Sequence, residues 1–411
     1  MNPLYNFGIR AYAFGAKVLA TRKEKVRKML DGQKATFERL SQRLDPSRRY
    51  VWIHASSLGE FEQGRPLIEM IRRERPDCHV VLSFFSPSGY EVRHDYAEAD
   101  AVVYLPFDLP KNAERFIDIV KPEMAIFVKY EFWGNYLSAL HRRGIPTYII
   151  SSIFRRGQIF FRPWGGMFRK MLRCFTHIYV QDDASRSMLA DIGVTNVTVA
   201  GDTRFDRVTD ILANVKEAAQ AEAIAASAKV TVVAGSTWPA DERFLLPYFN
   251  AHDDVKLIIA PHEVNEERVA EILAVISRKA VRLSQATPEQ AAQADCLVVD
   301  CFGMLSSIYH FGDVAYIGGG FGAGIHNINE AAVHSIPVVF GPKHEKFKEA
   351  SDLLTLGGAF SFIDNEGFTK IFDDLTSDTA RRHEAGETAG KYIADNLGAT
   401  RRIFDEIFVN A

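Results

Sequence analysis

The chain alternates between short, continuous apolar segments and helical patterns, and this alternation constrains its fold more than any other feature. Apolar strands that are separated by helices are typical of parallel sheets with helices on both faces, because such strands are buried on both sides. Two series of strands follow one another, separated by an alanine-rich helical stretch at 215–228. The predicted strands are Val51–Ala55, His79–Phe84, Ala101–Leu105, Met124–Val128, Thr147–Ile150, His177–Val180 and Val197–Ala200, then Val230–Ala234, Val255–Ala260, Cys296–Val299, Val314–Ile317 and Pro337–Phe340.

The length of the chain agrees with two such domains, because 411 residues correspond to two domains of ordinary size. We predict a boundary near 205–228, with a first parallel α/β domain over residues 25–210 and a second over 211–411. The prediction leaves open that the last helices of the second domain pack on the first domain. In facing α/β domains of this kind, we expect ligands in a cleft at the carboxyl ends of the strands.

The composition gives no support to several other classes of protein. A net charge of -3 does not argue for binding to nucleic acid or to a membrane through bulk charge. The four cysteines form no CxxC pair, which indicates reduced thiols rather than a zinc or disulfide framework. The sequence contains no run of about 20 apolar residues, so no helix is clearly predicted to span a bilayer.

Residues 1–24 form a basic, amphipathic helical pattern. Arg10 and Lys17 flank its apolar face, and no acidic residue precedes Glu24. This pattern predicts a helix that lies in a membrane interface. The alternative is an ordinary amphipathic helix docked on its own domain. The predicted apolar face consists of Tyr5, Ile9, Tyr12, Ala16 and Leu19.

A glycine-rich loop follows the strand at 314–317 and leads into a helical pattern. Glycines let a ligand approach the backbone closely, and a helix N-terminus offers free N–H groups to a phosphate. Glu330 could accept hydrogen bonds from ribose hydroxyls. The loop is not the dinucleotide fingerprint, because Ala323 stands where the last glycine of G-x-G-x-x-G is required. We therefore predict a nucleotide-sugar site, with a tight strand-to-helix turn as the alternative.

Three charged residues follow strands of the first domain. Glu60 lies at the start of a helix, where it could take a proton from a hydroxyl group, although a glutamate there also simply stabilises the helix. Glu131 ends a strand in an aromatic cluster in which Trp133 could be a core plug. Arg204 could meet a carboxylate or phosphate, or could form a surface pair with Asp206.

Polar motifs also follow several strands of the second domain. Because the carboxyl ends of parallel strands lie at one edge of a sheet, these motifs are expected to share the edge of the glycine loop. They include Ser236, Thr237, Pro261, His262, Phe302, Gly303 and Met304.

A basic and aromatic stretch covers residues 155–173 and contains no acidic residue. Its pattern is compatible with binding to RNA or to an anionic or phosphorylated lipid. A solvated helix and loop is the alternative. The residues that we assign to an acceptor or membrane surface are Arg155, Arg156, Arg162, Trp164, Arg169, Lys170 and Arg173.

Taken together, these motifs resemble those of 3-deoxy-D-manno-octulosonic acid (Kdo) transferases, the enzymes that add Kdo to the lipid A precursor. The resemblance keeps the order of the motifs and covers nearly the whole chain. The segments that carry it are His54–Glu60, Tyr104–Asp108, Glu131–Asn135, Gly201–Asp206, Ser236–Thr237, Pro261–His262, His326–Ala331 and Gly341–Lys348.

The resemblance implies a GT-B fold and an inverting transfer of Kdo from CMP-Kdo to the lipid A precursor (lipid IVA), without cofactor or metal. It assigns Glu60 as general base, Glu131 as the residue that stabilises the transition state, and Arg204 as its basic partner. It implies a place at the cytoplasmic leaflet of the inner membrane, either peripheral or anchored by the N-terminal helix, and no nucleic acid partner. The implied donor site contains Ser236, Thr237, Pro261, His262, Phe302, Gly303, Met304, Asn327, Ile328, Asn329 and Glu330.

Several positions depart from the pattern of the resembled family. His262 stands where an arginine usually meets the donor phosphate, and Asn329 stands where a leucine is usual. Lys129, Met304 and Gly134 replace a usual Glu, Glu and Pro. The competing interpretations are another GT-B enzyme that uses a UDP-sugar, either a transferase or a 2-epimerase, and a non-enzymatic scaffold that binds a membrane surface or RNA.

Overall fold

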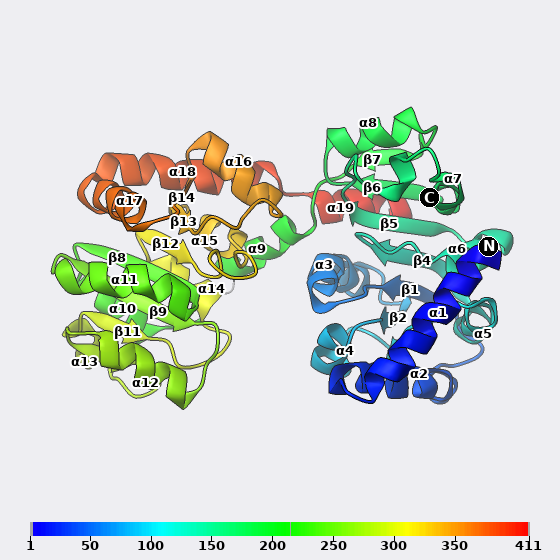
Figure 1. Ribbon diagram of the computed structural model, residues 1–411, viewed down its shortest axis with the longest axis horizontal. Helices are drawn as coiled ribbons and strands as arrows, with labels where there is room; N and C mark the ends of the chain where they lie inside the picture. Colours follow the sequence, from blue (N-terminus) through cyan, green and yellow to red (C-terminus); the bar gives the residue numbers. More distant parts are fainter. Residues whose placement is uncertain (1–2, 214, 410–411) are drawn as a thin grey trace. The chain divides into compact units, whose positions relative to one another are not determined.

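The computed structural model describes residues 3–213 and 215–409, which form two compact α/β units (Figure 1). The first unit comprises Met1–Asp206 together with Leu397–Ala411, and the second comprises Arg207–Asn396. The junction between the units therefore lies at the beginning of the range 205–228. The end of the chain belongs to the first unit, where Arg401 pairs with Glu74.

The described part of the first unit contains a parallel sheet of seven strands in the order β3-β2-β1-β4-β5-β6-β7. The prediction of a parallel sheet is confirmed, and each predicted strand of the first series has its counterpart within one or two residues. The strands are β1 Tyr50–His54, β2 His79–Phe84, β3 Ala101–Tyr104, β4 Pro122–Val128, β5 Thr147–Ser152, β6 His177–Val180 and β7 Val197–Val199.

Alternate residues of these strands face two apolar layers. Trp52 of β1 packs in one layer and Ile53 packs in the other, so both faces of the sheet are covered. This double burial explains why the strands are apolar throughout rather than at every second position. The helices of this unit are α1 Pro3–Ala20, α2 Glu24–Arg43, α3 Leu58–Glu74, α4 Pro87–Arg93, α5 Pro110–Val120, α6 Gly134–Arg142, η1 Ile159–Phe161, α7 Gly166–Leu172, α8 Asp183–Asp191, α19 Ala399–Phe404 and the π-helical η3 Asp405–Val409, with α9 Arg204–Ala213 continuing into the second unit.

The described part of the second unit repeats this architecture, with seven parallel strands in the order β10-β11-β9-β8-β12-β13-β14. Two strands, β10 and β14, were not predicted. Both are three residues long and lie at the edges of the sheet, where one side lacks a neighbouring strand, so they carry little apolar signal. The strands are β8 Val230–Thr237, β9 Val255–Pro261, β10 Ala280–Arg282, β11 Cys296–Val298, β12 Val314–Ile317, β13 Val338–Phe340 and β14 Ala359–Ser361.

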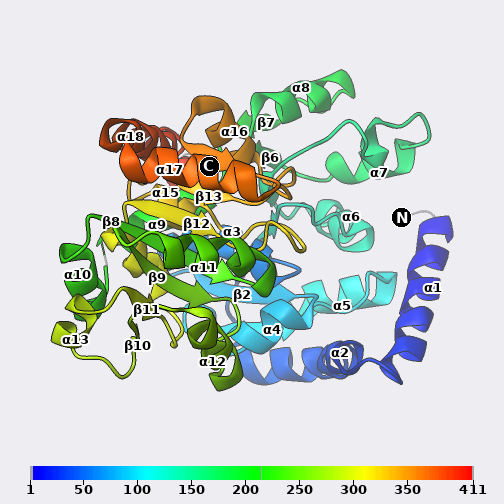
Figure 2. The same ribbon diagram turned by 60° about the vertical axis from the view of Figure 1, so that its left-hand side comes forward.

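Helices of the second unit pack on both faces of its sheet, as Figure 2 shows for α11 and α17 on one side. The helical stretch predicted at 215–228 is shorter in the structure, because Lys216 is held by bonds to Ser307 and Gly303 before α10 begins. The helices are α10 Ala219–Ala226, α11 Pro239–Ala251, α12 Glu266–Val275, α13 Pro288–Ala292, α14 Leu305–Ile308, η2 Tyr309–Phe311, α15 Asn329–Ala332, α16 Lys348–Leu356, α17 Asn365–Ser377 and α18 Thr379–Asp395.

In each sheet the winding direction reverses beside the strand with which that sheet begins. In the first unit the chain proceeds outward from β1 through β2 to β3, returns to β4 beside β1, and then proceeds outward the other way. In the second unit the reversal falls between β8 and β12. Open α/β sheets bind ligands at the carboxyl ends of the strands that flank such a reversal. These ends are therefore the positions at which each unit is expected to bind a ligand.

The N-terminal helix α1 lies beside α2 along the outer side of the first unit (Figure 2). The predicted apolar face is divided in the structure. Tyr5, Ile9 and Ala16 pack on the unit, as in the alternative of a docked helix, whereas Tyr12 and Leu19 are exposed. A further apolar stripe is exposed, and it follows the three- and four-residue steps of a helix. This stripe consists of Leu4, Phe7, Phe14 and Val18.

Hydrogen bonds tie α1 to the start of α6. The Tyr5 hydroxyl donates to buried Asp108 at 2.6 Å, and Asp108 also accepts the N–H groups of Asn135 and Tyr136. Gly134 donates its N–H to the Tyr5 oxygen at 3.3 Å, a bond that the proline usual in the resembled family cannot make. Among the described residues, no helix combines the length and the apolar character needed to cross a membrane.

Candidate functional site

Glu60 lies in the first turn of α3, just beyond the carboxyl end of β1. The Ser57 hydroxyl donates to its carboxylate at 2.6 Å. Burial raises the pKa of Glu60, and the negative charge of Glu131 raises it further, although Ser57 and His54 oppose the shift. A carboxylate with a raised pKa is a stronger base, which suits it to take a proton from a hydroxyl group.

Glu131 follows β4, the strand on the other side of the winding reversal, and its side chain is only 7% exposed. Burial alone would raise the pKa of Glu131, but hydrogen bonds from His54, Ser56 and Trp133 lower it below the ordinary value. The His54 Nε2 atom lies 3.1 Å from Oε2, and the Ser56 hydroxyl donates at 2.5 Å. Trp133 is thus more than a core plug, because its indole N–H also donates to Glu131.

The two carboxyl groups have pKa values shifted in opposite directions. Glu60 is held toward its protonated form and Glu131 toward its ionised form. Pairs of titratable groups with divergent pKa values mark acid–base sites, because each group is prepared for a different task. The arrangement can therefore provide one proton acceptor beside one carboxyl group that is held toward its ionised form.

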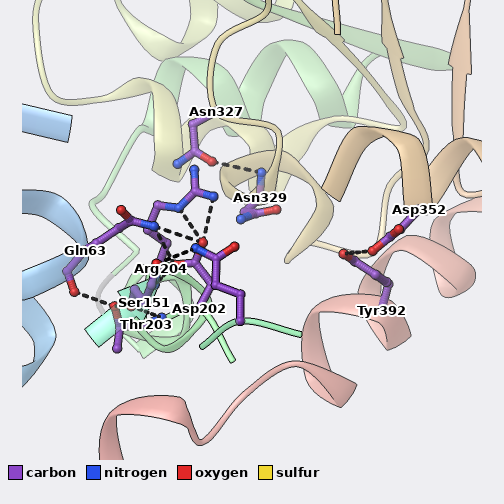
Figure 3. A network of polar contacts seen from close by, with 10 residues as sticks. Gln63, Ser151, Asp202, Thr203, Arg204, Asn327, Asn329, Asp352 and Tyr392 are labelled. Carbon is purple, nitrogen blue, oxygen red and sulfur yellow. Dashed lines mark hydrogen bonds and ion pairs between the residues drawn. The ribbon is translucent and has the colours of Figure 1, made fainter. Parts of the chain in front are cut away.

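Arg204 has a partner other than the predicted one. Its guanidinium donates to Asp202 through Nε at 3.0 Å and Nη2 at 2.8 Å, and Gln63 donates to the same carboxylate (Figure 3). Asp206, the partner considered in the alternative, accepts the N–H groups of Gly398 and Thr400. Although burial opposes it, the Arg204 charge holds the pKa of Asp202 below its ordinary value.

In the second unit, the residues that follow β8 and β9 form a stack of aromatic rings. The His262 ring lies 4.6 Å from Trp238 and 4.5 Å from His326, close to parallel with both. The Trp238 indole N–H donates to Nε2 of His326 at 3.3 Å. Pro261 is buried, and the Thr237 hydroxyl donates to Glu242, whereas Ser236 is half-buried.

The glycines of the loop after β12 are required by the fold itself. A Cβ atom on Gly318 would lie 2.1 Å from the Ser236 carbonyl oxygen, and one on Gly320 would lie 2.6 Å from the Gly341 backbone. Gly319 has a φ of 93°, a conformation that favours glycine. The tight-turn alternative therefore accounts for these glycines without a ligand, and the case for a ligand depends on the residues that follow.

The segment after the glycine loop ends in the short helix α15. Asn327 accepts the N–H of Asn329 and donates to Glu330 (Figure 3 shows the first of these contacts). Ile328 is buried, and Asn329 is completely buried. Within the described chain, neither polar atom of the Asn329 side-chain amide has a hydrogen-bond partner. Buried amides are nearly always bonded, so this amide is expected to meet a ligand or a water molecule.

The remaining predicted donor residues lie between β11 and α14. Phe302 is 77% exposed, and the Gly303 carbonyl accepts a bond from Lys216. Met304 is half-buried and precedes α14. Among the described residues, no three His, Cys, Asp or Glu side chains come together as metal ligands would.

The basic stretch 155–173 divides into core and surface residues. Phe160 is buried and Phe161 and Phe168 pack on the core of the first unit, so the aromatics are not an exposed binding face, apart from Trp164 at 71% exposure. Arg169 donates to the carbonyls of Phe160 and Arg162, which gives it a structural role. The exposed cations are Arg155, Arg156, Arg162, Lys170 and Arg173.

Sequence reasoning missed the roles of His54, Ser56 and Gln63 in the first unit and of Trp238 and His326 in the second. All of them lie within or next to the motifs that the sequence analysis identified after predicted strands. This proximity to strand ends was the signal by which they could have been found. What the sequence lacked was the pairing of distant segments: 77 positions separate His54 from Glu131, and 88 separate Trp238 from His326.

Comparison with known proteins shows which families have similar sequences and folds. The sequence model of the family described as 3-Deoxy-D-manno-octulosonic-acid transferase (kdotransferase) matches residues 33–207. The 3-deoxy-D-manno-octulosonic acid transferase of Bordetella pertussis is 28% identical over 87% of this chain and 86% of its own. That of Haemophilus influenzae is 24% identical over 88% and 87%.

Solved structures show a similar fold at low identity. Acinetobacter baumannii MurG has a TM-score of 0.57 and 15% identity, over 88% of this chain and 99% of its own. The UDP-GlcNAc 2-epimerase of Neisseria meningitidis has a TM-score of 0.58 and 13% identity, over 85% and 99%. The predicted GT-B fold class, with two Rossmann-like domains, is thereby confirmed. The predicted resemblance to the 3-deoxy-D-manno-octulosonic acid transferases is thereby confirmed over most of the chain, and it supports a transfer of Kdo in lipopolysaccharide biosynthesis.

Proposed function

We propose that this chain is an inverting glycosyltransferase that moves Kdo from CMP-Kdo to the lipid A precursor lipid IVA, with Glu60 as general base. One observation carries the proposal: two carboxyl groups with opposite pKa shifts follow the two strands that flank the winding reversal of the first sheet. A base with a raised pKa beside a carboxyl group held toward its ionised form suits attack by a hydroxyl group on a sugar that develops positive charge.

In the proposed reaction, the Glu60 carboxylate accepts the proton of the acceptor hydroxyl as its oxygen attacks the anomeric carbon of Kdo. The bond between that carbon and the phosphate oxygen breaks, and CMP leaves with the bonding electrons. Glu131 remains ionised and opposes the positive charge that develops on the sugar ring. The reaction needs no cofactor or metal in this scheme, because donors from the protein can offset the charge of the leaving phosphate.

For the donor, we propose binding to the second unit at the ends of β8 and β12. Three features support this position: the exposed imidazole of His262 in the ring stack, the unpartnered amide of Asn329, and the place of Asn329 after β12, a strand that flanks the winding reversal of the sheet. Glu330 is proposed to bind the ribose. Phe302, Gly303 and Met304 are proposed to lie along the nucleotide.

The first experiment is transfer itself. The wild-type protein is incubated with lipid IVA and CMP-Kdo generated in situ, and the product is analysed by mass spectrometry. We expect a mass increase of one or more Kdo residues. Thermal stabilisation by CMP but not by UDP is expected in parallel, because a ligand stabilises the state that it binds. Stabilisation by UDP with no Kdo product would instead favour a UDP-sugar transferase or 2-epimerase.

Asn329→Leu provides a test of the donor site. An unpaired buried amide costs about 1–3 kcal/mol, so leucine, which is close in size, is expected to raise the melting temperature of the free protein. If the amide binds the donor, the stabilisation by CMP falls in the same variant. Differential scanning fluorimetry measures both. His262→Ala is the comparison, since an exposed side chain should weaken donor binding without changing the stability of the free protein. Unaltered stabilisation of Asn329→Leu by CMP would remove Asn329 from the donor site.

We further propose that the protein is peripheral to the cytoplasmic leaflet of the inner membrane. The exposed stripe of α1 and the exposed cations of residues 155–173 support this, because apolar insertion and attraction to anionic lipids reinforce each other. Nothing in this arrangement calls for a nucleic acid partner.

Changing Leu4, Phe7, Phe14 and Val18 together to serine is expected to weaken binding to anionic lipid vesicles at least about tenfold, since each buried side chain contributes about 1.5–3 kcal/mol. Co-sedimentation with vesicles measures the effect. The matched control changes Leu356 and Ile363, which are exposed apolar residues of the second unit. Equal losses in both variants would argue against α1 as the binding element.

A further inference from the structure

His54 is the last residue of β1 and is completely buried. Its ring is enclosed by the rings of Trp52, Phe127 and Trp133, with the Trp133 centroid at 5.2 Å. The strand register places Ser83 of β2 on one side of His54, and the chain beyond β4 brings Glu131 to the other. A histidine in such an enclosed place has no solvent to satisfy its nitrogens, so both must find partners in the protein.

Both nitrogens of the ring have such partners. Nε2 lies 3.1 Å from Oε2 of Glu131, and Nδ1 lies 3.0 Å from the carbonyl oxygen of Ser83 and 2.9 Å from its hydroxyl. The Ser83 hydroxyl is itself oriented by the indole N–H of Trp52, which donates at 2.8 Å. An ionised carboxylate can only accept hydrogen bonds. Whenever Glu131 is ionised, Nε2 of His54 is therefore the donor in this contact.

The donors to Glu131 are distributed unequally. Among the described residues, the hydrogen bonds from His54, Ser56 and Trp133 all end on Oε2. Oε1 is left for another contact, and Glu131 lines a cavity of about 290 Å³ whose other walls are largely aromatic. Three donors on one oxygen both orient the carboxylate and stabilise its charge, because hydrogen bonds to charged groups are the strong ones.

We propose that His54 is a positioning residue, which holds Glu131 ionised and turned so that Oε1 faces the substrate. This inference rests on the proposed function, in which Glu131 stabilises the charge that develops on the sugar. His54 does not touch the substrate, since its ring is buried behind Glu131 and Trp133. Its effect passes through one hydrogen bond.

The electrostatic setting agrees with this role. The titratable side chains that interact with His54 are Glu131, from the loop after β4, and Glu60, from α3. The elements packed around the ring otherwise contribute the aromatic rings and the two serines. Loss of the Nε2–H donor would favour protonation of Glu131, and the enzyme would then need a higher pH to reach its active form.

Two variants distinguish positioning from simple packing. His54→Leu fills the space without a donor, whereas the amide nitrogen of glutamine in His54→Gln can replace Nε2. We expect kcat of His54→Leu to fall by about 10- to 100-fold, the equivalent of one hydrogen bond to a charged group, with little change in the KM for donor. The acid limb of its pH–rate profile should move to higher pH. His54→Gln should recover most of the activity, and the acid limb of its pH–rate profile should lie at the wild-type pH. Equal loss in both variants with an unmoved limb would overturn the inference.

A second measurement does not depend on Kdo transfer. In protein labelled with ¹³C at glutamate carboxyl groups, the Glu131 resonance is assigned by its loss in Glu131→Gln and is titrated in each folded variant. The titration of Glu131 should move to higher pH in His54→Leu but not in His54→Gln. This result would support the role of His54 even if the wild-type protein transferred no Kdo, in which case the proposed function alone would fail. An unchanged titration in His54→Leu would overturn the inference whatever the enzyme transfers.

Discussion

Glu60→Gln is expected to lower kcat by about 10²- to 10⁴-fold, the usual contribution of a general base. Glutamine keeps the size of the side chain and can still accept the Ser57 hydrogen bond, but it cannot take a proton at neutral pH. Single-turnover transfer to lipid IVA with saturating CMP-Kdo measures the chemical step. The control is Glu62→Gln, a glutamate on the same helix that pairs with Arg93. Wild-type turnover by Glu60→Gln would remove Glu60 from the role of base.

The same variant is expected to be more stable than the wild type at neutral pH. The folded state raises the pKa of Glu60, so ionisation of this group opposes folding. Below about pH 4, Glu60 is protonated in both states and the two proteins should be equally stable on this account. As pH rises through the pKa of folded Glu60, the wild type loses stability relative to the variant. Urea unfolding at several pH values measures the difference, and a loss of activity with a gain of stability would separate catalysis from folding.

Arg204→Ala is expected to reduce the free energy of unfolding by about 3 kcal/mol, because it leaves a buried carboxylate without its cation. Asp202 is 5% exposed and receives two hydrogen bonds from the guanidinium. The value lies at the lower end of the range for broken buried pairs, since Gln63 and the backbone N–H of Arg204 still donate to Asp202. Arg186→Ala is the control: it breaks an exposed pair with Asp183 and should change stability by less than about 0.5 kcal/mol.

The effect of pH on this pair has the opposite sign to that of Glu60. The pKa of Asp202 is lowered in the folded state, so the pair stabilises the protein above the unfolded pKa of about 3.9. This stability is lost as pH falls through the folded pKa, and the loss should be smaller in Arg204→Ala. Activity per folded molecule decides whether Arg204 also acts in catalysis. Full activity in the folded fraction would give Arg204 a purely structural role and would remove it from the predicted catalytic set.

The strands at the centre of each sheet were predictable because they are buried on both faces, which leaves a continuous apolar signal in the sequence. The edge strands β10 and β14 lack this signal and were missed. On α1 the helix itself was predicted correctly, but whether its predicted apolar face packs on the unit was left open. Apolar residues occur on two sides of α1, and only the packing of Tyr5 and Ala16 on the first unit shows which side faces inward.

The sequence also identified the candidate residues Glu60, Glu131 and Arg204, from their places after strands and from the resemblance to a family. It did not identify the side chains that form hydrogen bonds with them. Arg204 binds the carboxylate of Asp202, which was not predicted, and the histidine that contacts Glu131 lies in another motif. Hydrogen bonds within a turn follow from local sequence. Bonds between strand ends follow from the order in which the strands pair.

The sequence by itself therefore determined the fold class, the two sheets and the segments from which the candidate site is built, because burial and strand spacing are local properties of the chain. Only the tertiary structure decided which carboxyl group is held ionised and which is held toward protonation. That distinction depends on desolvation and on donors brought from segments far apart in the chain, and no local pattern records the distance between them.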